Sequence, residues 1–167
     1  MQSEALKKLS ERYKDAELQD IDGEFPVPVG KICERLGIEA FYVKLPDNIS
    51  GNLYKEGGKY YIKANEGHHP YRRRFTVAHE LGHYLKHKEY LDSKKEILER
   101  SDTIYTESER QMEAEANRFA AELLMPTKVF IQKYLKSNDL QELADYFFTS
   151  KDAIKFRLIN LGYRIGC

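Results

Sequence analysis

The sequence predicts an α+β fold that is mostly helical, with a small β-sheet and a helical extension at its C-terminus. Two stretches carry apolar residues at helical spacing, one centred on Ala78 and one from Glu107 to Met125. Before the first of these stretches, two short segments of strand character flank Gly57-Gly58. This pattern is typical of a β-hairpin. Residues 1–126 are expected to form the main domain, and residues 127–167 an extension packed on it.

Composition excludes several classes of protein. Lys+Arg and Asp+Glu each total 27, so the formal net charge is zero, which argues against a protein whose main task is to grip nucleic acid. No apolar run approaches the roughly 18 residues needed to span a membrane. Cys33 and Cys167 are too few for a disulfide framework or a cysteine metal site. These features fit a soluble protein of a reducing cytoplasm.

The N-terminal elements follow from local patterns. The first 20 residues predict a charged amphipathic helix, and residues 25–29 a connector. A short helix from Val29 should end at Gly37 and carry Cys33 on its apolar side. Residues 40–45 predict a strand, and the hairpin follows with strands 51–55 and 59–64.

The segment His79-Glu80-Leu81-Gly82-His83 carries the clearest chemistry. On a helix, His79 and His83 lie one turn apart on the same face and could bind one zinc ion. Glu80 comes next along the helix, where it could act as a general base towards a metal-bound water. The surrounding helix is apolar nearly all round, which predicts that it is buried.

A catalytic metal needs a third ligand. His87 shares the face of His79 but lies about 12 Å from it along the axis, so we interpret it as a solvent-facing residue. The helix from Glu107 to Met125, which Thr106 and Glu109 should cap, offers two glutamates. Glu113 lies at the edge of the apolar face and is favoured over Glu115, which points further round.

Asn117 strengthens the choice of Glu113. It stands one helical turn beyond that residue, where it could hydrogen-bond the free nitrogen of a ligand histidine. His68 and His69 have no defined spacing to the motif and are left out of the site. Three arginines, Arg72 to Arg74, oppose the helix dipole and are expected to meet carboxylates, either within the chain, which is favoured, or on a substrate. Residues 92–106 predict a connection between the two helices, with a lid as an alternative.

Three helices should follow Pro126, at 127–136, 139–148 and 150–161. The last two resemble a helix-turn-helix, although the turn around Phe148 lacks the usual glycine. Acidic residues surround Lys151, Lys155 and Arg157. A packing or partner-recognition role is therefore favoured over DNA reading.

Two segments resemble the signatures of the ImmA/IrrE family of metallopeptidases. They are RRRFTVAHELGH at residues 72–83 and EAEANRFAAELLMP at residues 113–126, within a weaker similarity from about Val27 to Gly162. The resemblance implies a zincin-like fold and a zinc-dependent peptidase. In this sequence His79, His83 and Glu113 would be the ligands and Glu80 the base. It also implies a typical substrate, a helix-turn-helix transcriptional repressor encoded nearby, often by a mobile element or in a stress response.

Other interpretations remain beside the peptidase. Manganese or iron could occupy a site of two histidines and a carboxylate, although zinc is the default. The chain could be a non-proteolytic metal-binding regulator, or a component of a toxin–antitoxin pair, that acts by binding a repressor. A DNA-binding regulator is a third class, disfavoured by the zero net charge.

Overall fold

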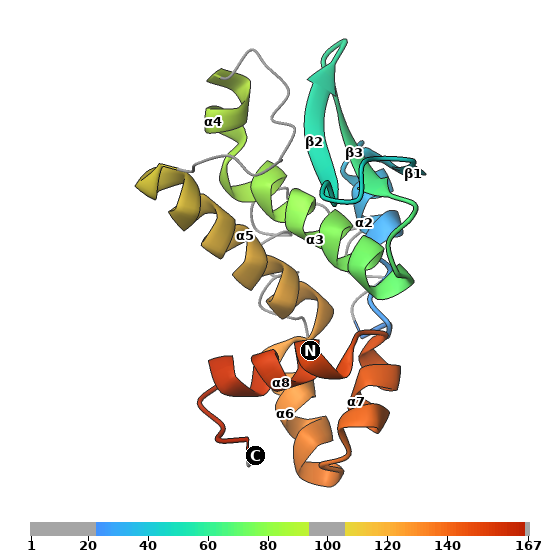
Figure 1. Cartoon of the computed structure of the whole chain (residues 1–167), viewed down its shortest axis with the longest axis vertical. Coiled ribbons are helices and arrows are strands. Elements are labelled where there is room, and N and C mark those ends of the chain that lie inside the picture. The colour runs from blue at the N-terminus through green and yellow to red at the C-terminus, as the bar shows by residue number, and fades with distance from the viewer. Residues whose placement is uncertain (1–22, 94–105, 166–167) are drawn as a thin grey trace. The chain divides into compact units, whose positions relative to one another are not determined.

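A computed structural model describes residues 23–93 and 106–165. The helix expected in the first 20 residues, and most of the expected connection 92–106, lie outside this part of the chain. Helices and one small sheet make up the described residues, which confirms the predicted α+β class (Figure 1). The chain divides into two compact units, one of residues 29–120 and one of the described residues among 1–28 and 121–167. The division expected after residue 126 stays a prediction.

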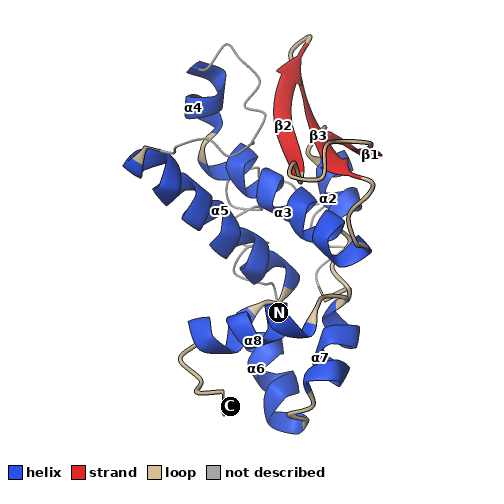
Figure 2. Cartoon of the chain, viewed as in Figure 1, coloured by secondary structure: helices blue, strands red, loops and turns tan. Residues whose placement is uncertain are grey.

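A three-stranded sheet forms one part of the first unit, and Figure 2 shows its strands in red. The strands β1 (Glu39–Val43), β2 (Gly51–Glu56) and β3 (Lys59–Asn65) lie in the order β1-β3-β2. The pair β2–β3 is antiparallel, whereas β1 runs parallel to β3. Gly57 and Gly58 join β2 to β3 with φ of 55° and 82°, a backbone that favours glycine in two-residue hairpins. The predicted hairpin is confirmed, and among the described strands β2 lies at an edge of the sheet.

Helix α3 (Pro70–Lys86) packs against β2 and β3. Pro70 stands in its first turn, where a missing N–H costs nothing, and His69 Nδ1 accepts a hydrogen bond from the backbone N–H of Tyr71. Ten successive residues, 76–85, are buried, as the apolar pattern predicted. Gly51 lets β2 begin against this helix, because a Cβ there would lie 2.6 Å from the Thr76 methyl group.

Two further helices belong to the first unit at least in part. Helix α2 (Val29–Arg35) contacts β1 and α3. Its Cys33 is fully buried, and this burial raises the pKa of the thiol to about 12, as fits a core residue. Helix α5 (Glu107–Leu124) begins at the predicted capping box. Thr106 donates its backbone N–H to Glu109, and the Glu109 N–H donates back to the Thr106 hydroxyl.

The short helix α4 (Lys88–Ser93) was not predicted. Asp92 and Ser93, expected in a connection, form its last turn instead. The Asp92 carboxylate accepts hydrogen bonds from the Tyr60 hydroxyl and, at 2.9 Å, from Lys55 Nζ. These two donors hold the pKa of the Asp92 carboxyl below its usual value. Contacts with the hairpin, which are remote in sequence, therefore hold the chain in this position after α3.

The second unit holds α6 (Thr127–Lys136), α7 (Leu140–Phe147) and α8 (Lys151–Asn160), close to the predicted ranges. Its buried side chains include Phe130, Leu143, Phe147, Ile154 and Leu158. At the turn after α7, Phe148 adopts the left-handed conformation, with φ of 49°, that glycine usually takes. Its backbone N–H donates to the carbonyls of Ala144 and Asp145 and so closes α7.

Arg157 of α8 is nearly buried and forms an ion pair with Glu122 in the same unit. Its Nε also donates to the Met125 carbonyl at 3.1 Å. Replacing Glu122 with Ala should destabilise the protein by about 3 kcal/mol, because it leaves a buried cation without its carboxylate partner. Urea unfolding checks this. The matched control is Asp152→Ala, which breaks the exposed pair with Lys155 and should change little; equal effects of the two variants would contradict the account.

Candidate metal centre

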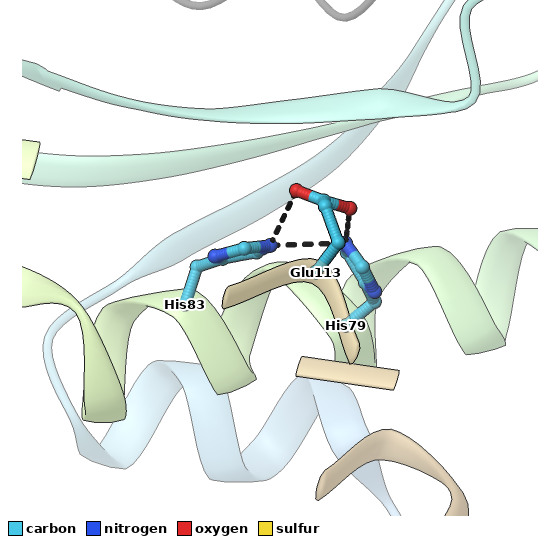
Figure 3. Close-up of side chains that lie close together, drawn as sticks. All are labelled: His79, His83 and Glu113. Carbon is cyan, nitrogen blue, oxygen red and sulfur yellow. Dashed lines mark hydrogen bonds and ion pairs between the residues drawn. The ribbon is translucent and has the colours of Figure 1, made fainter. Parts of the chain in front are cut away.

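Three side chains from two helices meet at one point. Helix α3 contributes His79 and His83 from successive turns, and α5 contributes Glu113 (Figure 3). The two Nε2 atoms lie 3.1 Å apart. Each is 3.2 Å from an oxygen of the Glu113 carboxylate, His79 from Oε2 and His83 from Oε1. The structure thus brings together the three residues that the sequence singled out as a ligand set.

These separations fit a divalent metal ion. Zinc binds nitrogen and oxygen ligands at about 2.0–2.1 Å, and in tetrahedral geometry such ligands lie about 3.3 Å from one another. The observed spacings of 3.1 and 3.2 Å match that value. Two imidazoles and one carboxylate are also a donor set that zinc and similar divalent ions accept. His79, His83 and Glu113 could therefore hold a metal ion together.

Asn117 fixes the orientation of the first histidine. His79 Nδ1 lies 2.8 Å from the Asn117 side-chain oxygen, which can only accept a hydrogen bond. This contact requires a proton on His79 Nδ1, so in the neutral imidazole the lone pair lies on Nε2, the atom that faces Glu113 and His83. This is the hydrogen bond expected from the position of Asn117 on α5, and such a partner orients a metal-binding imidazole.

Glu80 lines a cavity beside these residues. The cavity has a volume of about 300 Å³, and its walls include His79, Glu80, Glu113 and Asn117 from the two helices. Ser50 and Gly51, where β2 begins, also line the cavity. Glu80 itself is 2% exposed. A carboxylate in such a cavity, next to the His79–His83–Glu113 cluster, is placed to exchange a proton with a molecule bound there.

The prediction that His87 faces solvent is wrong. It is buried, 8% exposed, in the capping position of α3. Its Nδ1 lies 3.0 Å from His83 Nδ1, and its Nε2 lies 3.0 Å from a carboxylate oxygen of Glu115. The hydrogen bond from His87 holds the pKa of the Glu115 carboxyl below its usual value. Glu115 thus contacts His87, whereas Glu113 contacts His79 and His83.

The arginines before the motif make contacts other than those expected. Arg72 donates to the Ser50 hydroxyl at 2.9 Å, and Arg73 stacks its guanidinium over the Tyr42 ring at 4.8 Å. Burial lowers the pKa of Arg74 to about 10. Within the described residues, a hydroxyl and an aromatic ring therefore take the place of the internal carboxylates predicted for Arg72 and Arg73. The alternative, carboxylates of a substrate, stays a prediction. Sequence spacing gave no signal for either contact, because both partners lie on a distant part of the chain.

Gly82 sets the distance between the two helices. A Cβ at this position would lie 3.0 Å from a ring carbon of Phe119 and 3.2 Å from the Ala116 Cα. Replacing Gly82 with Ala should therefore destabilise the protein by about 1 kcal/mol, since overpacking outweighs the better helix propensity of alanine. It should also weaken metal binding, because Glu113 comes from the displaced helix. Chemical unfolding and zinc titration check both effects.

The matched control for Gly82→Ala is Gly30→Ala. Gly30 also lies within a helix, but a Cβ there would meet no atom within 4 Å. This control should be neutral or stabilising by up to about 1 kcal/mol and should leave zinc affinity unchanged. If both variants were stabilised alike, close packing at Gly82 would not govern the spacing of α3 and α5.

Comparisons with known proteins agree with this geometry. Residues 33–159 match the model of a family described as Peptidase_M78, IrrE N-terminal-like domain, a match that covers more than half of the chain. No curated protein matches the chain in sequence. Among solved structures, a Mycobacterium tuberculosis transcriptional regulator is similar in fold, with a TM-score of 0.63 and 20% identity. The match covers 94% of this chain and 47% of the regulator, so this chain spans about half of the length of the regulator.

Proposed function

Because the chain belongs to the Peptidase_M78 family of IrrE N-terminal-like domains, we propose that it is a metal-dependent endopeptidase whose metal is held by His79, His83 and Glu113. The observation that carries this proposal is the convergence of the three ligand atoms beside the cavity that Glu80 lines. Zinc is the ion we expect, since two imidazoles and a carboxylate are its common donors at catalytic sites.

The residues of the proposed site have two roles, metal binding and proton transfer. A bound divalent ion supplies Lewis acidity, which makes water a better nucleophile and polarises the peptide carbonyl. Glu80 takes the proton of the attacking water and passes it to the leaving amine. Asn117 keeps the His79 lone pair directed at the site through the hydrogen bond to Nδ1. The cavity walls position the peptide bond against Glu80.

The substrate we propose is a helix-turn-helix repressor encoded near this gene, cut in the cytoplasm. Strand β2 supports a protein substrate, since it lies at the edge of the sheet and its first residue lines the cavity. An extended segment of the substrate can add to such an edge as a further strand and place its backbone beside Glu80. None of the helices in residues 23–93 and 106–165 is long and apolar enough to cross a membrane.

Co-expression tests the proposed activity. Each small helix-turn-helix protein encoded beside this gene is expressed with the wild-type chain or with the Glu80→Gln variant, and its fragments are sought by mass spectrometry. Metal-dependent cleavage by the wild-type chain alone is expected. Equal binding of the intact repressor by both chains, without cleavage, would instead support a non-proteolytic regulator. A gel shift of this chain on DNA at two salt concentrations tests the third class of protein, a DNA-binding regulator.

A further inference from the structure

We propose that His87 and Glu115 form a positioning relay that holds His83 in the tautomer able to bind metal. The relay rests on the proposed function in one respect, namely that His83 is a metal ligand. It consists of two hydrogen bonds in series, Glu115 to His87 and His87 to His83, each with donor and acceptor 3.0 Å apart. Figure 3 shows the far end of this series, where the Nε2 edge of His83 faces Glu113 and His79.

The direction of each hydrogen bond follows from the chemistry of its atoms. An ionised carboxylate only accepts, so Glu115 requires a proton on His87 Nε2. A neutral imidazole with its proton on Nε2 has a lone pair on Nδ1. As long as His87 is neutral, its Nδ1 is therefore an acceptor, and the proton in the second bond belongs to His83 Nδ1. The His83 lone pair is consequently left on Nε2, the atom that lies 3.2 Å from Glu113.

The two histidines of the motif are thus oriented by different hydrogen-bond partners. His79 donates from Nδ1 to the Asn117 amide oxygen in a single step. His83 lies one turn further along α3, and His87 stands between it and α5. His83 and His87 are 3% and 8% exposed, so water has little access to their ring nitrogens. The partly exposed Glu115 anchors the series at its outer end.

Zinc affinity tests the relay, measured on the full chain by competition with a chelator. His87→Leu removes the acceptor for His83 and should weaken zinc binding about 10–100-fold. His87→Asn places a carbonyl oxygen where Nδ1 stood and should bind zinc more tightly than His87→Leu. Glu115→Ala should also weaken binding, whereas Glu115→Gln keeps an acceptor and should stay near wild type. The matched control is Glu89→Gln, at an exposed residue of the neighbouring helix.

A second readout needs no metal. Long-range ¹H–¹⁵N correlation spectra of the metal-free chain at neutral pH identify the protonated nitrogen of each histidine. The relay predicts a proton on His83 Nδ1 in the wild type and a shift towards Nε2 in His87→Leu. Circular dichroism confirms that each variant is folded, and if His87→Leu does not fold, Glu115→Ala against Glu115→Gln takes its place.

Two results would overturn the relay. One is a metal-free wild type whose His83 carries its proton on Nε2. The other is a folded His87→Leu that binds zinc as tightly as the wild type. If the wild type bound no zinc, the proposed function would fail, but the position of the His83 proton would still decide whether the relay exists.

Discussion

Replacing Glu80 with Gln is expected to abolish peptide hydrolysis while the metal stays bound. The glutamine side chain has nearly the same shape, but its amide cannot take a proton from water. General-base catalysis contributes about 10²–10⁴-fold, so the rate of cleavage should fall by at least about 100-fold. Because Glu80 is not one of the three residues whose ligand atoms converge, metal affinity should not change. Cleavage of the identified repressor at fixed metal content measures the effect.

The control for this experiment is Glu89→Gln. It makes the same chemical change on the exposed α4 and should leave cleavage unaffected. Full activity of the Glu80→Gln variant would remove Glu80 from the mechanism, and loss of its metal would mean that Glu80 holds the ion.

Replacing Glu113 with Ala should have the largest effect on metal binding. It removes one of the three proposed ligands, which is a greater loss than the 10–100-fold that a partner of a ligand contributes. We therefore expect zinc affinity to fall by more than about 100-fold. Titration with zinc, followed by competition with a chelator and by the rise in Tm that bound metal causes, measures the change.

Glu115→Ala is the matched control, since it removes the same side chain two residues further along α5. Its carboxylate contacts His87 rather than the point where His79, His83 and Glu113 meet. Glu115→Ala should therefore bind zinc more weakly than the wild type, as the relay predicts, but more tightly than Glu113→Ala, and should still fill when zinc is in excess. Loss of binding in Glu115→Ala together with full binding in Glu113→Ala would reverse the assignment of the ligand.

Local periodicity was sufficient to predict much of the candidate site. His79 and His83 are four residues apart on one helix, so their convergence followed from helical geometry alone. Glu113 and Asn117 are likewise four residues apart, and the apolar face of α5 indicated that both point towards α3. The family resemblance is confirmed by the match over residues 33–159.

Contacts between distant segments could not be predicted from the sequence. The spacing of His87 placed it on the same face as His83, but its burial depends on how closely α5 lies along α3, which Gly82 and Ala116 permit. The same holds for α4, whose Asp92 contacts the hairpin, and for the parallel pairing of β1 with β3. In each case the contacting residues lie on another element, and the periodicity within one segment carries no information about such contacts.

Elemental analysis of the purified wild-type chain tests the central claim most directly. We expect one divalent metal ion per chain, with zinc as the metal, retained through mild purification or restored when zinc is added. A wild-type chain that holds no metal, even in the presence of added zinc, would contradict the metallopeptidase proposal and leave a binding protein with an inactive site.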